Sequence, residues 1–319
     1  MLSRKHKLLL MKIISLFSVV RGYNIPIIVL AQYLSAIFIL APERRALSVL
    51  LDFNFFIIVL SSALAIASGY IINNFYDSKK DLINRPNKSM LDRLVSQETK
   101  LKVYFGLNLA ATLLALIVSW RASLFFATYI FLIWFYSHKL KRYLIVGNLM
   151  AALLAIFPFF GNLLYYFYKM PITEIESLIL NLEVIFTHAS FLFILILIRE
   201  LVKDLENIKG DLVNNYQTIP VIYGENASKR VITILIVLTL IPVYFLVDFF
   251  NVGYMDIYFY SCLIVLIFFG LLLWKSDSKA QFLKLHNILK ILIITGVFSI
   301  VLIDPSVLIH GKQMLLKIP

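Results

Sequence analysis

Cysteine and charged side chains are both scarce in this chain of 319 residues. The single cysteine, Cys262, excludes an intramolecular disulfide and a cysteine-based metal site. Charged residues make up 15% of the sequence, whereas a soluble chain carries about 25%. So little charge cannot cover the surface of a soluble globule of this length. The same composition excludes a disordered chain, a collagen and a coiled coil.

Apolar residues take the place of the missing charges. Hydrophobic residues reach 61%, against roughly 45–50% in soluble proteins, and the mean hydropathy is +0.88. An integral membrane protein with several spans is therefore predicted, with the lipid bilayer as a partner. The net charge of +12 is typical of cytoplasmic loops that contact anionic headgroups, so we do not expect nucleic acid as a partner.

Nine apolar segments approach the length of about 20 residues that a helix needs to cross a bilayer. Helices are expected because lipid offers no partners for backbone groups, and the segments are too long for barrel strands. No repeat or low-complexity tract divides the chain, so residues 1–319 are predicted to form one domain, an all-α integral membrane bundle. The nine segments are 23–41, 53–74, 102–120, 122–138, 144–166, 181–199, 231–249, 257–274 and 288–304.

The Lys and Arg residues set the expected orientation. If the N-terminus is cytoplasmic, 24 of the 30 lie in cytoplasmic segments, which the positive-inside rule favours. With nine spans the C-terminus is then extracytoplasmic, and a bacterial or archaeal cell membrane is the expected location. The basic and apolar N-terminal stretch has no small-residue cleavage site, so we interpret it as retained. Segment 82–100 is predicted to form a cytoplasmic cap that limits water.

Acidic residues gather at two helix ends. After the second span, Asn73, Asp77 and Asp81 recur every four residues and share an arc of about 80° on one helical face. A second face, about 60° wide, follows the sixth span. Its members are Glu200, Asp204, Asn207 and Asp211. Both faces, called the two acidic stripes below, are predicted to lie at the cytoplasmic side.

Two such stripes predict a cation site. Carboxylates spaced i and i+4 repel each other and weaken a helix, so a bound cation that neutralises them is expected. Asp and Asn oxygens suit Mg²⁺, which takes one or two carboxylates and leaves room for substrate phosphates. The alternative, two solvated helix ends, explains a single Asp better than it explains two clusters on one membrane side.

The residues around both stripes resemble the motifs of a known family. The pattern N-x-x-x-D-x-x-x-D over residues 73–81, followed by N-R-P at 84–86, resembles the first aspartate-rich motif of the UbiA superfamily of intramembrane prenyltransferases. The stretch R-E-x-x-K-D-x-x-N-x-x-G-D at 199–211 is similar to the second. Y-S-x-x-L-K-R at 136–142 and R-G-Y-N at 21–24 resemble two further stretches of the family.

Two positions depart from the family pattern. Asn74 and Asn207 stand where the family often has Asp. Asparagine keeps an oxygen that can bind a cation but lacks the negative charge, so the affinity or the position of the metal is expected to differ.

The resemblance implies a fold, a reaction and a site. It implies a UbiA-like bundle of nine transmembrane helices in which Mg²⁺ helps to bind a polyprenyl diphosphate, while a small lipid or aromatic acceptor captures the prenyl group. The implied metal ligands are Asn73, Asp77, Asp81, Asp204, Asn207 and Asp211. The implied catalytic residues are Asp77, Asp81, Asp204 and Asp211. The implied substrate-binding residues are Arg21, Asn24, Arg85, Tyr136, Ser137, Lys141 and Lys203.

The acceptor stays open at this point. The N-R-P and R-E-x-x-K-D stretches are most similar to the branch that alkylates geranylgeranylglyceryl phosphate, and an aromatic quinone precursor such as 4-hydroxybenzoate is the alternative. A cation-coupled transporter is the alternative of another class, but transporters commonly show repeats and broken helices at mid-membrane. Here the carboxylates lie at helix ends, which favours the enzyme. His188 is interpreted as a packing residue. Asn148 fits a site residue and an interhelical hydrogen-bonding residue equally well.

Overall fold

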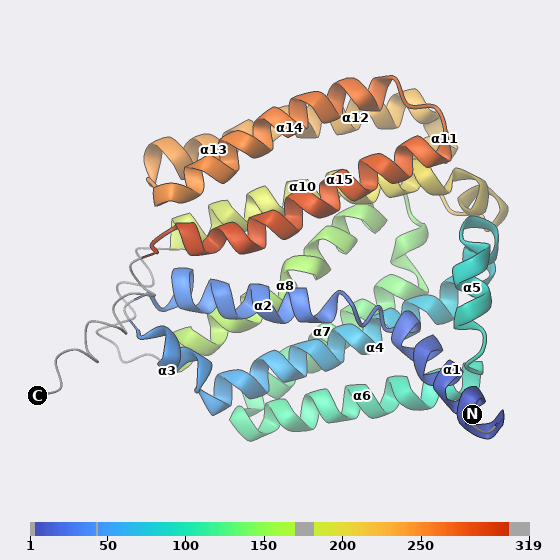
Figure 1. Ribbon diagram of the computed structural model, residues 1–319, viewed down its shortest axis with the longest axis horizontal. Helices are drawn as coiled ribbons and strands as arrows, with labels where there is room; N and C mark the ends of the chain where they lie inside the picture. Colours follow the sequence, from blue (N-terminus) through green and yellow to red (C-terminus); the bar gives the residue numbers. More distant parts are fainter. Residues whose placement is uncertain (1–3, 43, 170–181, 306–319) are drawn as a thin grey trace, which may run out of the picture.

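Helices make up the structure of this chain, a computed structural model that describes residues 4–42, 44–169 and 182–305. No strand occurs within these ranges. Figure 1 shows long helices that lie side by side and run between two ends of a bundle. The prediction of an all-α fold is therefore confirmed.

Seven helical segments of the described chain are long and apolar enough to cross a bilayer. They are α4 (Phe53–Asn84), α6 (Gln97–Val118), α8 (Val146–Lys169), α10 (Leu182–Val213), and the runs Glu225–Phe249, Gly253–Trp274 and Lys279–Leu302. The last three runs contain α12 (Glu225–Leu238), α13 (Leu240–Tyr244), η3 (Phe245–Phe249), η4 (Gly253–Met255), α14 (Asp256–Trp274), α15 (Lys279–Ser299) and η5 (Ile300–Leu302). The chain is thus a multi-pass membrane protein.

The other two predicted spans, 23–41 and 122–138, are helical as well. The first contains α2 (Ile25–Ser35) and a five-residue π-helical turn, η1 (Ala36–Leu40), which together are shorter than the roughly 20 residues of a typical span. The second is α7 (Trp120–His138), whose 19 residues include Trp, Tyr, Arg and His and are therefore less apolar. The count of nine spans stays a prediction.

α4 and α10 continue well past the predicted spans, which end at residues 74 and 199. Both acidic stripes therefore lie on unbroken helix. A helix satisfies its own backbone hydrogen bonds, so a polar helix end can continue beyond the lipid without new backbone partners. Residue 181, the expected start of the sixth span, and the extracytoplasmic C-terminus predicted from the charge count lie outside the described residues.

Four further helices precede or connect the long ones. They are α1 (Arg4–Val19), α3 (Ala46–Leu50), α5 (Pro86–Asp92) and α11 (Ile219–Tyr223). α5 begins at a proline, which suits the first turn of a helix because its missing N–H would be unpaired there anyway. Hydrogen bonds from Ser15 to the carbonyl of Leu91 (2.8 Å) and from Ser18 to Asp92 (2.7 Å) attach α1 to α5. The predicted cap segment 82–100 thus contains a helix, although its role as a cap stays a prediction.

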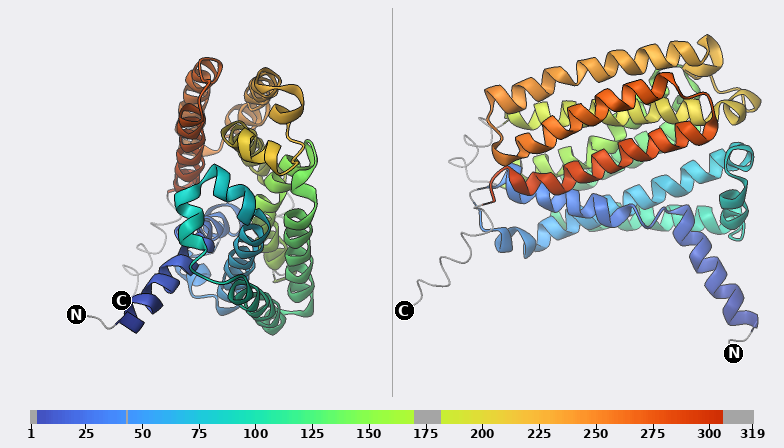
Figure 2. Two further views of the ribbon diagram at one scale, coloured as in Figure 1. Left: turned by 90° about the vertical axis from the view of Figure 1, so that its right-hand side faces the viewer. Right: turned by 45° about the horizontal axis from the view of Figure 1, so that its top comes forward.

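The helices form two groups that meet where α4 contacts α10. α4 packs against α6 and α7, whereas α10 packs against α8, α12 and α15. α2 contacts both α4 and α15 and so joins the two groups. Figure 2 shows the C-terminal helices on one side of the bundle and the N-terminal helices on the other. Each side has its own apolar core, with Phe55 in the first and Phe259 in the second.

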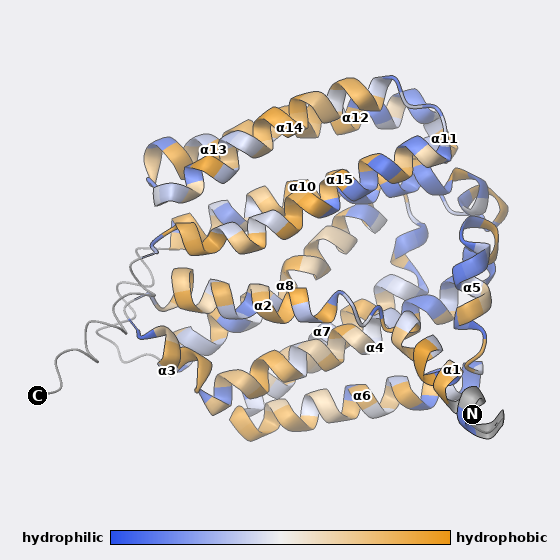
Figure 3. Cartoon of the chain, viewed as in Figure 1, coloured by the Kyte–Doolittle hydropathy of each residue, from blue (hydrophilic) through white to orange (hydrophobic). Residues whose placement is uncertain are grey.

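Polarity is distributed unevenly along the bundle. Figure 3 shows hydrophobic residues along the long helices and hydrophilic residues at the end that carries α5 and α11. The last turns of α4 and α10 lie at this same end (Figure 1). The fold therefore brings both acidic stripes to one end of the molecule.

Candidate active site

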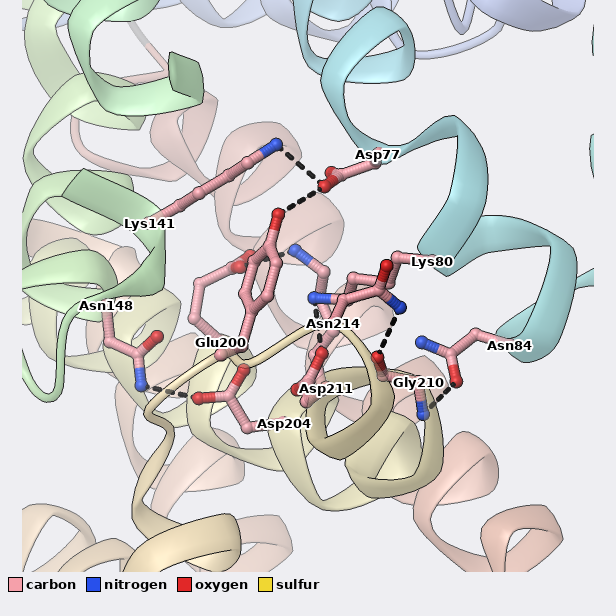
Figure 4. A network of polar contacts seen from close by, with 12 residues as sticks. Asp77, Lys80, Asn84, Lys141, Asn148, Glu200, Asp204, Gly210, Asp211 and Asn214 are labelled. Atoms are coloured by element: carbon pink, nitrogen blue, oxygen red, sulfur yellow. Dashed lines mark hydrogen bonds and ion pairs between the residues drawn. The ribbon is translucent and has the colours of Figure 1, made fainter. Parts of the chain in front are cut away.

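Residues of both acidic stripes face one polar pocket between α4 and α10, and Figure 4 shows the network of polar contacts in and beside this pocket. Asn73, Asp77 and Asp81 contribute from α4. Glu200, Asp204 and Asn207 contribute from α10. The other residues that line the pocket are Val19, Arg21, Tyr70, Asn74, Lys80, Arg85, Lys88, Tyr136, Lys141, Asn148, Lys203, Tyr216 and Thr218.

α4 and α10 approach each other closely at Gly210. The amide of Gly210 donates a hydrogen bond of 3.1 Å to Oδ1 of Asn84, the last residue of α4 (Figure 4). A Cβ atom at position 210 would lie 2.3 Å from Nδ2 of Asn84, so the absence of a side chain permits this approach. Lys279 of α15 donates to the carbonyl of Asn84. Asn84 therefore joins three helices and fixes the spacing of the two stripes.

Asp77 is the most heavily contacted carboxylate of the first stripe. Lys141 pairs with its Oδ1 at 2.7 Å, and the hydroxyl of Tyr216 donates to the same atom at 2.9 Å. Lys141 also donates to Oδ1 of Asn73 at 3.3 Å. Burial lowers the pKa of Lys141, while the charge of Asp77 acts in the opposite direction. Asp77 thus connects α4 to two segments that are far away in the sequence.

Lys80 lies between the two acid-bearing helices. Its ammonium forms an ion pair of 2.5 Å with Asp211, whose side chain is fully buried, and lies 4.1 Å from the ring centroid of Tyr216. Burial and the neighbouring Asp77 raise the pKa of Tyr216, so its hydroxyl stays protonated and able to donate. Lys80 of α4 therefore neutralises Asp211, one acid of the second stripe on α10.

The remaining acids of the second stripe have different partners. Asn148 of α8 donates a hydrogen bond of 2.8 Å to Asp204, so Asn148 bonds between helices. Lys203 pairs with Glu200 at 2.7 Å on the same helix. Asn207 is buried, and no donor among the described residues reaches its Oδ1 atom. An unpaired buried oxygen beside a polar pocket is costly and indicates a ligand position.

Asn74 contacts α5 and α6 rather than joining the acids around Asp77. Its amide nitrogen donates to Asp92 at 3.0 Å, and its Oδ1 accepts from Lys100 at 2.8 Å. An asparagine can donate and accept at once, whereas an ionised aspartate can only accept. Lys88 also pairs with Asp92 at 2.9 Å. The departure at this position therefore has a structural reason, because Asp92 is buried and needs donors.

Arg85 and Arg21 lie on the rim of the pocket. Arg85 pairs with the buried Glu206 of α10 at 3.0 Å and so ties the start of α5 to α10. Arg21, in the connection between α1 and α2, lies over the ring of Tyr70 at 5.0 Å. Tyr136 lines the pocket from α7.

Three of the residues that the sequence predicts for the site do not line the pocket. Asn24 precedes α2 at its N-cap position but makes no side-chain cap hydrogen bond. Ser137 is buried, and its hydroxyl has no partner among the described residues. Asp211 is fully buried and pairs with Lys80, which itself lines the pocket. The remaining predicted residues do line the pocket.

Sequence reasoning missed several residues that line the pocket. In the sequence Lys80 counts only as one of the Lys and Arg residues expected on the cytoplasmic side, yet it follows Asp77 by three residues and so shares a helical face with the first stripe. Its spacing could have identified it. Tyr216 and Thr218 follow α10 in an irregular connection, where no periodic pattern indicates which way a side chain points.

A metal ion has suitable donors here but no complete cluster as the side chains stand. Within the described ranges, no three Asp, Glu, His or Cys side chains lie close enough together to hold a metal ion. Ammonium groups separate them, with Lys141 at Asp77 and Lys80 at Asp211. The donor set still fits Mg²⁺, which prefers carboxylate and amide oxygens, and the unpaired oxygen of Asn207 supports this fit.

A second, apolar cavity lies deeper in the bundle. Its walls come from α2, α8, α10, α14 and α15, and include Ala155, Leu192 and Phe259. Leu192 lies on α10 about 18 Å along the helix axis from Asp204. His188 also faces this cavity, and its Nδ1 lies 3.0 Å from the carbonyl of Val184. Residues of α10 thus line a polar pocket at one level and an apolar cavity at another.

Three comparisons relate the chain to known proteins. Residues 13–293 match the UbiA prenyltransferase family. A digeranylgeranylglyceryl phosphate synthase from Methanosphaera stadtmanae is 29% identical over 244 residues, which cover 75% of this chain and 84% of the relative. A structure from work on digeranylgeranylglyceryl phosphate synthase in membranes is similar with a TM-score of 0.65 at 20% identity, covering 92% of this chain and 98% of the other. A UbiA homologue from Archaeoglobus fulgidus bound to DMAPP and Mg²⁺ gives 0.61 at 16% identity, with coverage of 90% and 99%.

Proposed function

Because this chain belongs to the UbiA prenyltransferase family and is a membrane-embedded prenyltransferase, we propose that it transfers a polyprenyl group to the hydroxyl of a glycerophosphate lipid. The donor is a polyprenyl diphosphate, and the acceptor is geranylgeranylglyceryl phosphate. Similarity to a relative named digeranylgeranylglyceryl phosphate synthase supports this acceptor. The motifs at 84–86 and 199–211 favour the same branch.

One observation supports the proposal most strongly. Residues of the two acidic stripes from α4 and α10 face a single polar pocket, and an apolar cavity lies deeper along the same bundle. A prenyl diphosphate has the same division, with a highly charged head and a hydrocarbon tail. In our proposal the diphosphate occupies the pocket and the tail extends toward the cavity.

Mg²⁺ is the proposed cofactor. Its proposed ligands are Asn73, Asp77, Asp81, Asp204 and Asn207. When bound, Mg²⁺ neutralises the negative charge that develops on the leaving diphosphate. Asp211 is left out of this set because its carboxylate is fully buried and pairs with Lys80.

The protein's own residues orient and shield the reactants. Lys141 and Tyr216 meet at Asp77 and present hydrogen-bond donors to the pocket. The acceptor oxygen forms a bond to the first carbon of the prenyl group, while the bond from that carbon to the diphosphate breaks and its electron pair leaves with the diphosphate. The hydroxyl proton passes to a carboxylate of the pocket. α5 at the rim limits access of water, which would compete as a nucleophile.

A transfer assay with purified protein tests this function. The protein is incubated with Mg²⁺, prenyl diphosphates of several lengths, and either geranylgeranylglyceryl phosphate or 4-hydroxybenzoate, and products are identified by mass spectrometry. We expect the digeranylgeranyl ether product. A prenylated 4-hydroxybenzoate in place of that ether would contradict the proposed acceptor, and the absence of any prenylated product would contradict the proposed reaction.

Asp77→Asn is the matched variant for the same assay. It keeps the size and an oxygen of Asp77 but removes one charge from a site that holds cations. We expect transfer to fall by about two orders of magnitude, because metal charge stabilisation contributes several kcal/mol to the transition state. Because the change leaves the buried ammonium of Lys141 without its charged partner, we also expect a lower free energy of unfolding, so transfer is measured on variant protein shown to be folded. Near-normal transfer at limiting Mg²⁺ would remove Asp77 from the reaction.

A further inference from the structure

Arg21 differs from every other cation of the polar pocket. Six Lys and Arg side chains line this pocket, and five of them form ion pairs with carboxylates. The pairs are Lys80–Asp211, Arg85–Glu206, Lys88–Asp92, Lys141–Asp77 and Lys203–Glu200. Arg21 forms no ion pair with a carboxylate of the described residues: its guanidinium lies over the ring of Tyr70, and its charge acts on Asp81 without such a contact.

The backbone and an aromatic ring hold Arg21 in place. Its φ angle is 48°, in the left-handed region, which costs a non-glycine residue about 1 kcal/mol and is kept only where the surroundings enforce it. Gly22 follows, and a Cβ atom there would lie 2.2 Å from the ring of Phe17, so the turn is tightly packed. Stacking on Tyr70 occupies one face of the guanidinium and leaves its in-plane N–H donors available.

Such a group is suited to an anion with several oxygens. A guanidinium donates two parallel hydrogen bonds to a phosphate, and these charge-assisted bonds are stronger than neutral ones. In the proposed reaction two anionic groups enter the same pocket. Lys141 and Lys80 lie among the acidic stripes, where the diphosphate and Mg²⁺ are proposed to bind. The acceptor brings a second phosphate, which needs a cation of its own.

We propose that Arg21 binds the phosphate of the acceptor lipid and thereby selects phosphorylated over neutral acceptors. This assignment rests on the proposed function. Arg21 lies just before α2, an apolar helix whose side chains are mostly half-buried, whereas the donor tail is proposed to extend toward the cavity. An acceptor whose phosphate contacts Arg21 can therefore lay its hydrocarbon chain along α2. The glycerol backbone then keeps the reacting hydroxyl within a few bonds of the anchored phosphate.

Steady-state kinetics of Arg21→Gln test the assignment. Glutamine keeps a polar side chain but loses the charge and the paired donors. We expect the KM for geranylgeranylglyceryl phosphate to rise about 10- to 100-fold, the loss expected for a charged hydrogen bond, while the KM for the prenyl diphosphate stays within about twofold. With geranylgeranylglycerol, which lacks the phosphate, wild type and variant should react equally. Arg21→Lys should give an intermediate KM, because it keeps the charge and loses the planar fork.

Arg121→Gln is the matched control. Arg121 also lies over aromatic rings, at 5.3 Å from Trp120 and 4.8 Å from Tyr168, but it belongs to the start of α7, away from the pocket. This control should leave both KM values unchanged. If it raises the acceptor KM as much as Arg21→Gln does, the specific role of Arg21 is excluded.

The outcomes separate this inference from the proposed function. A rise in the KM for the diphosphate, alone or equal to that for the acceptor, would assign Arg21 to the donor and overturn the inference. A lower kcat with unchanged KM would overturn it as well. If wild type does not prenylate the phosphorylated lipid at all, the proposed function is wrong instead. Should Arg21→Gln not fold, Arg21→Lys decides by the same comparison of the two KM values.

Discussion

Lys80 belongs to α4, which bears the first acidic stripe, and its ammonium pairs with Asp211 of the second acidic stripe. It is the partner of Asp211, which is fully buried, and removal of one partner of a buried ion pair leaves the other charge uncompensated. We therefore expect Asp211→Asn to lower the free energy of unfolding by about 3 kcal/mol, and Lys80→Met combined with Asp211→Leu to restore most of it. Thermal melts in detergent measure both effects.

Binding of Mn²⁺ as a probe for Mg²⁺ distinguishes the two possible roles of Asp211. If Asp211 serves as the partner of Lys80, Asp211→Asn changes the affinity for Mn²⁺ by less than about twofold, whereas loss of a direct carboxylate ligand weakens it strongly. Asp204→Asn is the comparison variant, since Asp204 lines the pocket. A large loss of Mn²⁺ affinity with an unchanged melting temperature would make Asp211 a metal ligand, as the sequence predicts.

The packing of α4 against α10 sets the geometry of the site at the scale of elements. Gly210 allows Asn84 to approach α10, and a Cβ atom there would overlap the Asn84 side chain. We expect Gly210→Ala to lower the free energy of unfolding by about 1–3 kcal/mol and to reduce prenyl transfer, because overpacking moves one stripe relative to the other. Thermal melts and the transfer assay measure the two effects.

Two variants control this prediction. Gly106→Ala introduces a Cβ atom into open space on α6, so it should be neutral or slightly stabilising. Gly210→Ala combined with Asn84→Ala removes the overlapping amide and should recover part of the lost stability. An unaltered melting temperature in Gly210→Ala alone would show that the close approach does not determine the helix spacing.

The whole molecule places the site on one side of the membrane. Lys88, next to the acidic end of α4, and Lys209, at the acidic end of α10, lie at the same end of the bundle, since both flank residues of one pocket. We expect topology reporters inserted near these two residues to read cytoplasmic, and a reporter after Pro319 to read extracytoplasmic, as the positive-inside rule predicts. Reporters at Lys88 and Lys209 on opposite sides would contradict a shared site.

Local patterns in the sequence determined the long helices and the acidic faces of this protein. Apolar segments of membrane-spanning length define the long helices, because a helix in lipid must satisfy its own backbone hydrogen bonds. The four-residue spacing of Asn73, Asp77 and Asp81 defines an acidic face for the same local reason, since helical periodicity fixes which side chains share a face. Helix ends were less well determined, as α4 shows by continuing to Asn84.

Only the tertiary structure decided which groups meet. Tyr216 reaches Asp77 across 139 positions of sequence, and Arg85 reaches Glu206 across 121. Such contacts depend on how whole helices pack, and no local spacing encodes them. The sequence by itself therefore determined which residues are acidic, helical and near one membrane face. Packing decided that Lys80 neutralises Asp211 and that Arg21 lies over Tyr70 without an ion pair to a carboxylate of the described residues.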